Sequence, residues 1–374
     1  MKRLVFFLIG LALAACSPRT LEPRFIADGA PEALSDWGMV GILGARLILA
    51  RGVQPYELNT PLFTDYAGKL RTIWIPGGQA AAWTPDAAFD FPVGTVVTKT
   101  FFYPKGPDGS VTPGDDLRLS ETGEGLDLHK VRLVETRILV RRASGWVAFP
   151  YVWNKAQTRA TLKRTGQPIP MTLIRPGRSD RFVYQVPNVN QCAGCHATDH
   201  EARALLPIGL KSRHLDREVT VAGARFNQLE HLTMVGYLRG LPASGLPASG
   251  RVRAPDWRDE TASLDGRARA WLDINCGHCH SPRGPADTSG LYLDATSPVG
   301  PSLGLCKPPV AAGQGTGGFA HGIEPGKPDE SILIFRTRST DPGAMMPELG
   351  RALTHDQGVA LLRRWIAAMP PGCR

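Results

Sequence analysis

The sequence predicts an α+β chain of several domains, in which an N-terminal all-β domain of the sandwich or barrel type precedes two α-helical modules. Residues 47–187 carry the β prediction, because they are rich in Val, Thr, Phe, Tyr and Trp and are interrupted by Pro and Gly about every ten residues. The helical prediction comes from apolar residues at helical spacing after Cys192. Each predicted module contains one Cys-x-x-Cys-His pentapeptide, at residues 192–196 and 276–280.

The amino terminus resembles a bacterial export signal. Lys2 and Arg3 precede an apolar run at residues 4–15 that is too short to span a bilayer as a mature helix. We therefore predict that residues 1–15 are a signal peptide and that the mature chain lies outside the cytoplasm.

The end of this signal, Leu-Ala-Ala-Cys, resembles the lipobox at which bacterial lipoproteins are cleaved and acylated. We predict that Cys16 is a lipid anchor and that residues 16–46 form a tether, since several acyl chains on one residue give stable membrane attachment. The uncharged Ser17 favours the outer membrane over the inner one. The alternative is ordinary cleavage, which leaves Cys16 as an unmodified thiol.

Individual strands are predicted within residues 47–187. Residues 70–75, 95–103 and 131–142 combine β-branched and aromatic residues with partial alternation of apolar and polar positions. The run at 131–142 is followed by Ser-Gly and by a second apolar run at 146–153, so these two runs form a predicted hairpin. We expect the strands to build a sandwich or a distorted barrel.

The two pentapeptides have the spacing that attaches a c-type haem. The two thiols add to the haem vinyl groups, and the adjacent His becomes the proximal ligand of the iron. Because bacteria attach haem to Cys outside the cytoplasm, the export signal supports this interpretation. We therefore predict two covalently bound haem c groups, one held by Cys192 and Cys195 with His196 as axial ligand, the other by Cys276 and Cys279 with His280 as axial ligand.

Two other interpretations of the motifs are open. A Cys-x-x-Cys pair occurs in thioredoxin-like redox proteins, and two such pairs can bind one zinc ion tetrahedrally. Zinc pairs are usually closer in sequence than these two, and neither kind of site requires a His after the second Cys. His278, inside the second motif, is interpreted as a surface residue.

The first haem module is assigned to residues 188–240. It contains a predicted helix at 225–239, with apolar residues at three-residue steps and Gly240 at its end. A tandem Leu-Pro-Ala-Ser-Gly repeat follows, which indicates a linker at 241–254. The second haem module, at 255–374, is expected to be like a cytochrome c.

Two helices are expected to enclose the second haem. One is an amphipathic helix at residues 263–276 that has Trp271 on its apolar side and delivers the second motif. The other closes the chain, with Thr354 as N-cap and Val359 and Trp365 on its apolar face.

Met346 is the predicted sixth ligand of the second haem, since it lies in a Gly-Ala-Met-Met-Pro loop just before the closing helix. Met345 and His321 are its alternatives. Met/His ligation raises the reduction potential and closes the iron to other ligands, as an electron carrier requires. For the first haem, Met234 is the candidate, and an open sixth position is the alternative. The other residues considered are Met171, His200, His214 and His231.

Cys306 and Cys373 remain after the motifs and Cys16 are assigned. In an oxidising compartment, such a pair predicts a disulfide, and two independent buried thiols are the alternative. Arg336 and Arg338 are candidates to pair with haem propionates, although a solvated strand face explains them equally well.

Composition and motifs exclude several functional classes. The formal net charge is +9, but no run of Lys and Arg with interleaved aromatic residues indicates nucleic-acid binding. A mildly basic face can steer an acidic redox partner. The sequence has no nucleotide-binding glycine motif, nucleophile elbow or His-Glu-x-x-His motif, so hydrolysis and hydride transfer have no visible machinery.

Five segments are distinctive beyond the haem motifs: residues 56–67, 91–95, 188–196, 226–229 and 346–347. With these segments, the chain resembles an uncharacterised family of bacterial dihaem c-type cytochromes, which are cell-envelope lipoproteins with an N-terminal β domain. The resemblance covers most of the mature chain. It implies covalent haem and redox work in the envelope, and it implies no substrate.

The sequence therefore predicts a periplasm-facing, lipid-anchored dihaem cytochrome that transfers electrons in the bacterial cell envelope. Its expected partners are redox proteins, such as an envelope dehydrogenase, a quinol oxidase or another cytochrome, and the membrane through its lipid anchor. The alternative is a dihaem redox enzyme, a peroxidase or a small-substrate oxidase, with an open first haem. A third hypothesis makes the β domain a docking or carbohydrate-binding module, which a β pattern alone cannot decide.

Overall fold

The computed structural model describes residues 21–115, 117, 125–221, 223–242, 253–310 and 313–373. The predicted signal peptide, the Cys16 anchor and most of the predicted linker lie outside these residues. Among the described residues, none of the helices has both the length and the apolar character that a membrane span requires.

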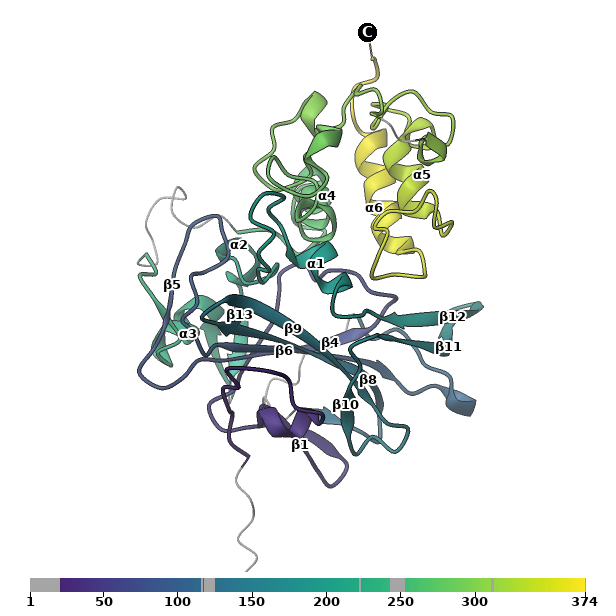
Figure 1. Cartoon of the computed structure of the whole chain (residues 1–374). Coiled ribbons are helices and arrows are strands. Elements are labelled where there is room, and N and C mark those ends of the chain that lie inside the picture. Colours follow the sequence, from purple (N-terminus) through teal and green to yellow (C-terminus); the bar gives the residue numbers. More distant parts are fainter. Residues whose placement is uncertain are drawn as a thin grey trace, which may run out of the picture.

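A six-stranded antiparallel sheet with the order β10-β9-β8-β6-β4-β3 forms the centre of the molecule (Figure 1). A second sheet has the order β1-β2-β7, and three two-stranded sheets pair β11 with β12, β13 with β14 and β5 with β15. The strands are β1 Val40–Leu43, β2 Arg46–Leu49, β3 Gln54–Tyr56, β4 Gly68–Trp74, β5 Ala81–Ala82, β6 Val96–Pro104, β7 Leu126–Asp127, β8 Val131–Arg142, β9 Gly145–Trp153, β10 Ala160–Leu162, β11 Gln167–Arg175, β12 Arg178–Val186, β13 Glu218–Val221, β14 Ala224–Asn227 and β15 Leu238–Arg239.

The longest strands are those that the apolar runs predict. β4, β6 and β8 overlap the predicted runs at 70–75, 95–103 and 131–142, and β8 and β9 form the predicted hairpin. Gly145 has a φ of 122° at the end of this turn, a conformation that L side chains rarely adopt. The predicted hairpin is therefore confirmed.

The central sheet is buried on both faces. Alternate residues of each strand point to opposite sides, so neighbours such as Val96 and Val97 enter different cores. One face packs against the β1-β2-β7 layer and the turn at Leu34–Trp37, where the Trp37 indole donates to the Tyr151 hydroxyl over 2.7 Å. The other face packs against the segment that carries the first pentapeptide.

The helices are α1 Gln191–His196, α2 Ser212–Leu215, α3 Gln228–Met234, α4 Leu264–Leu272, α5 Ile332–Arg338 and α6 Asp356–Ala367. The prediction of two α-helical modules is wrong. The structure is mostly β, with 29% strand and 21% helix, and the six α-helices of the described residues are short. Long Gly- and Pro-rich segments separate the helices, because Pro lacks the N–H that a helix needs and Gly loses more conformational freedom on folding than other residues.

The first predicted module shows why the helical expectation fails. Residues 225–227 belong to β14, which pairs with β13 across a turn at Gly223, where φ is 81°. The Asn227 side chain then accepts the Leu229 N–H over 3.0 Å and caps the short helix α3. The apolar residues at three-residue steps in 225–239 are thus divided between strand β14 and helix α3.

The last segment contains α4, α5 and α6, which lie together above the central sheet in Figure 1. The Ser263 hydroxyl accepts the Gly266 N–H over 3.1 Å and caps α4. Thr354 is not the cap of α6, since its hydroxyl donates to the Arg338 carbonyl over 3.1 Å and His355 occupies the N-cap position. A π-helical turn at Asp273–Gly277 continues α4 into the second pentapeptide.

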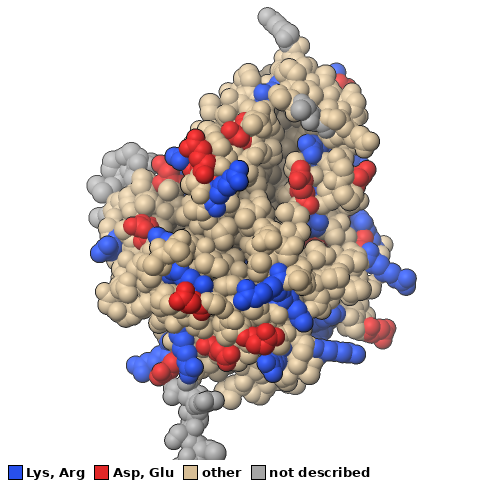
Figure 2. All heavy atoms as spheres, viewed as in Figure 1, with Lys and Arg blue, Asp and Glu red and all other residues tan. Residues whose placement is uncertain are grey.

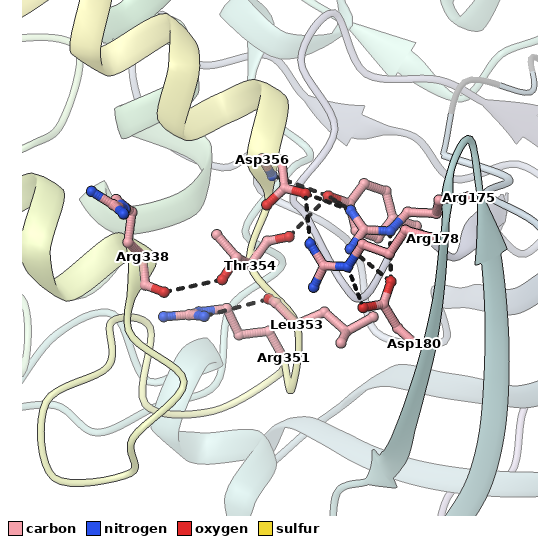
Figure 3. A network of polar contacts seen from close by, with 9 residues as sticks. Arg175, Arg178, Asp180, Arg338, Arg351, Leu353, Thr354 and Asp356 are labelled. Atoms are coloured by element: carbon pink, nitrogen blue, oxygen red, sulfur yellow. Dashed lines mark hydrogen bonds and ion pairs between the residues drawn. The ribbon is translucent and has the colours of Figure 1, made fainter.

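Polar contacts join the β11-β12 hairpin to the start of α6 (Figure 3). Arg175 pairs with Asp180 of its own hairpin at 2.7 Å and with Asp356 at 2.6 Å, and Arg178 pairs with Asp180 at 2.6 Å. The Tyr66 hydroxyl accepts the Asp356 N–H over 3.0 Å. These contacts fasten the helical segment to the β part of the chain.

Candidate functional site

The two pentapeptides lie side by side. Helix α1 carries Cys192, Cys195 and His196, and it lies between the central sheet and the end of α4 (Figure 1). The Cys279 thiol of the second motif contacts the Gly194 carbonyl of the first at 3.5 Å. Two motifs that are far apart in the sequence thus form one site.

The segments that follow the two motifs are also joined. The Arg283 guanidinium forms an ion pair with Asp199 at 2.5 Å, and the His200 N–H donates to the Arg283 carbonyl over 2.8 Å. His200 also lies 3.7 Å from Asp287. The two motifs are therefore held together by their direct contact and also by the contacts between the segments that follow them.

Cys192, Cys195 and His196 line a first cavity, whose opposite wall is formed by strands β4, β6 and β8. The cavity encloses about 1660 Å³ of empty space, counting the part open to solvent. The first motif thus faces a cavity that is walled on its other side by the central sheet.

The ring of His196 is oriented by the backbone. Its Nδ1 lies 2.7 Å from the Leu206 carbonyl, and because a carbonyl only accepts, Nδ1 must carry the hydrogen. Burial, together with the charge of Lys99, lowers the pKa of His196 to about 3. The imidazole is therefore neutral with a free lone pair on Nε2, which is the state that metal-ligating histidines adopt.

A second cavity, of about 1550 Å³ counting its open part, is lined by Cys276, Cys279 and His280. Its other walls are mostly apolar and include Leu293 and Ile323. The face drawn in Figure 2 is hollowed in the upper part of the molecule, where α4 faces α5 and α6. Burial lowers the pKa of His280, so this imidazole is also neutral.

The four cysteines of the motifs are free thiols. Burial raises the pKa of Cys276 and of Cys279 to about 12, so these thiols are protonated. Among the described residues, the one group of three side chains close enough to share a metal ion is His321, Glu324 and Cys373, so the four thiols do not form a common zinc site. Cys373 is itself in a disulfide with Cys306, as the sequence predicts.

Met346 lies in the wall of the second cavity and also borders the first. Its N–H donates to the Arg336 carbonyl over 3.0 Å, and its own carbonyl accepts Arg351 Nη2 over 2.8 Å. Met345 and His321, the alternatives, line neither cavity, and His321 contacts Glu324 at 2.5 Å. The structure therefore brings Met346, and not its alternatives, to the second motif.

The structure does not bring Met234 to the first motif. Its side chain is 62% exposed on α3 and lines neither cavity, because α3 turns Leu229 and Leu232 toward the core. The other residues considered are also outside the first cavity: Met171, His200, His214 and His231.

Arg336 and Arg338 have different positions. Arg336 lines the second cavity, and its Nε donates to the Ala344 carbonyl over 3.0 Å. Arg338 lies outside both cavities and faces Asp329 at 3.7 Å. Both belong to helix α5, so the strand interpretation of this segment is wrong.

The sequence did not indicate that His278 and His355 are buried at the cavities. His278 is only 7% exposed and lines both cavities, so its interpretation as a surface residue is wrong. His355 lines the first cavity and stacks on Phe63 with ring centroids 4.3 Å apart. The His355 Nδ1 accepts the Trp271 indole N–H over 3.0 Å, so Nε2 carries the hydrogen, and this buried Nε2 has no partner among the described residues.

His355 follows Thr354 in a stretch that indicates only the start of a helix. No sequence pattern therefore indicated that His355 lines the first cavity. His278 could have been suspected because it lies between the two cysteines of a motif. Comparison with protein-family models, with curated proteins and with solved structures finds no match. The two motifs and the geometry of the two cavities are therefore the features that indicate a function.

Proposed function

We propose that this protein is a dihaem c-type cytochrome that transfers electrons in the bacterial cell envelope. The observation that carries the proposal is the contact between the two pentapeptides, each of which lines its own cavity. The orientation of His196 supports it, since a neutral imidazole with Nδ1–H bonded to a carbonyl is the form that coordinates iron.

The residues fit two haem groups. Cys192 and Cys195 would hold the first, and Cys276 and Cys279 the second, through thioether bonds. His196 and His280 would be the proximal ligands, and Met346 is the candidate sixth ligand of the second haem. When bound, haem supplies an iron that accepts and releases single electrons.

The protein contributes orientation and exclusion of water. The Leu206 carbonyl orients His196, and the two hydrogen bonds of the Met346 backbone fix the position of its side chain. The walls of the second cavity are mostly apolar, and an apolar site with Met/His ligation favours a high potential.

The two cavities share part of their walls. Cys195, His278, Met346 and Leu349 border both of them. Electrons would therefore cross from one site to the other through a single layer of side chains. We propose a redox protein as partner on the outside, and attachment of the chain to the outer membrane through acylated Cys16.

The test is to count covalent haem in protein matured in a bacterial host that attaches haem c. The wild type should carry two haems. The Cys192→Ala/Cys195→Ala variant should keep only the second haem, and the Cys276→Ala/Cys279→Ala variant should keep only the first. A Cys306→Ser/Cys373→Ser variant is the matched control and should keep both. Wild-type protein without covalent haem, by the pyridine haemochrome assay, would overturn the proposal.

Attachment to the membrane has its own test. Cys16→Ser should move the protein from the membrane fraction to the soluble periplasmic fraction, while both haems are retained. Unchanged fractionation of this variant contradicts the lipid anchor without affecting the haem assignment.

A further inference from the structure

Three basic side chains form one row across the central sheet. Arg71 on β4 is the direct cross-strand partner of Lys99 on β6, and Lys99 is the direct partner of Arg137 on β8. Tyr56 on β3 continues the row beyond Arg71. Since cross-strand partners point to the same face, four hydrogen-bond donors stand side by side on this sheet.

This row faces the first cavity. Tyr56, Arg71, Lys99 and Arg137 all line it, together with Cys192, Cys195 and His196 of the first pentapeptide. No Asp or Glu is present among the described residues that line this cavity. Like charges directly opposite each other on neighbouring strands destabilise a sheet, so the arrangement is unfavourable unless something anionic compensates it.

Compensation within the chain is partial. The Arg137 guanidinium pairs with the fully buried Glu135 at 2.6 Å. The Lys99 ammonium has no hydrogen-bond or ion-pair partner in the described part of the chain, and its contact is the Phe101 ring, 5.3 Å from the ring centre. Burial, together with the charge of Arg137, lowers the pKa of Lys99 to about 7.

We propose that the row of Tyr56, Arg71, Lys99 and Arg137, called here the donor row, binds a small inorganic oxyanion inside the first haem cavity. The inference rests on the proposed function, because the cavity is assigned to haem. An oxyanion matches the donors, since several N–H and O–H groups can converge on its oxygen atoms. The anion would lie beside the first haem, where the donor row would hold its oxygen atoms.

The haem propionates are the other source of anionic oxygen. The donor row lies near the cysteines of the first motif, because the charges of Arg137 and Lys99 act on both Cys192 and Cys195. Thioether bonds form at the vinyl edge of haem, and the propionates leave from the opposite edge. The position of the row therefore favours a separate anion over the propionates.

The experiment is calorimetric titration of the two-haem protein with nitrite in a chloride-free buffer. The variants are Lys99→Met, which removes the charge, and Lys99→Arg, which retains it. Lys155→Met is the matched control, since Lys155 is exposed at the turn after β9. Covalent haem is counted for every variant, and the carbon monoxide spectrum of the reduced protein reports access to iron independently of charge.

We expect the wild type, Lys99→Arg and Lys155→Met to bind one nitrite per chain. The affinity of Lys99→Met for nitrite should be lower by a factor of about ten or more. Haem content and the carbon monoxide spectrum should be the same in all four proteins. Absence of saturable nitrite binding in the wild type, or equal affinity in Lys99→Met, overturns the inference.

Two further outcomes are distinguishable. If Lys99→Met shifts the potential of the first haem or loses that haem while the nitrite affinity is unchanged, the row serves the propionates and the inference is overturned. If no variant and no wild-type sample contains covalent haem, the proposed function fails by the haem count alone, before any nitrite is added.

Discussion

The two cavities differ in the secondary structure and in the side chains that form their walls. The first has a wall of β-sheet that presents Arg71, Lys99 and Arg137 in register. The second has apolar walls from the helical segment and presents the Met346 side chain. A sheet can hold several charged groups in a fixed row because each strand contributes one, whereas a loop can deliver a single ligand such as a thioether. The two sites therefore differ in the charge that their walls present.

The largest expected effect of a single substitution is at the second site. Met346→Ala should open its iron completely, so that the reduced protein binds carbon monoxide at the second haem, and it should lower the potential of that haem. Met345→Ala is the matched control, since Met345 is buried but lines neither cavity. Carbon monoxide spectra and potentiometric titration measure both effects. Equal carbon monoxide binding in the two variants contradicts ligation by Met346.

Arg137→Met should destabilise the sheet at the first site. Glu135 is fully buried, and it accepts Arg137 Nη2 at 2.6 Å and Nε at 3.0 Å, with Tyr184 as its remaining partner at 2.7 Å. An unpaired buried charge costs about 3–5 kcal/mol in free energy of unfolding. Urea denaturation measures the loss. Arg132→Met, on the same strand, is the control, and a comparable loss in both would contradict the account.

Asp65 links the β part to the loop that precedes α6. It is 2% exposed and accepts the N–H groups of Ala352 and Leu353 over 2.8 and 2.7 Å. Burial raises the pKa of Asp65 from 3.8 to about 6, and these two hydrogen bonds oppose that shift. Between these two values the folded state holds the proton more tightly than the unfolded state does.

The free energy of unfolding should therefore decrease by an Asp65 contribution on the order of 3 kcal/mol as the pH rises from about 4 to about 6. Asp65→Asn removes this contribution while its side-chain oxygen still accepts both bonds. Denaturation of the two proteins at several pH values gives the difference between their curves. Parallel curves would show that Asp65 is ionised over the whole range.

The smallest expected effect is at Lys99. In the absence of added anion, Lys99→Met should stabilise the chain by about 0.2–1 kcal/mol, because it relieves the repulsion from Arg71 and Arg137. Thermal denaturation checks this gain against Lys155→Met, which should leave the stability unchanged. Loss of stability in Lys99→Met would mean that its aliphatic stem packs better than the charge repels.

Local patterns predicted the β part well. The apolar runs of β4, β6 and β8 and the Ser-Gly turn before β9 are signals that need only a few neighbouring residues. The motifs also identify four cysteines and two histidines that line the two cavities. These features are short-range, and the handful of residues that define them are next to each other in the chain.

The rest depended on contacts between distant segments. The three-residue spacing of 225–239 is shared between β14 and α3, because β14 pairs with β13, and this pairing ended the predicted long helix. His278 and His355 enter the cavities only because α1, α4 and the sheet meet. The donor row is invisible in the sequence, where Arg71, Lys99 and Arg137 are far apart and only strand register aligns them.

The central claim is that one chain holds two haem groups at two touching motifs. The most direct test is the mass of the intact protein after maturation in a host that attaches haem c, measured under denaturing conditions. The account predicts the mass of the processed chain plus two haems, and plus one haem in each double-cysteine variant. A wild-type mass equal to that of the polypeptide and its lipid alone would contradict it.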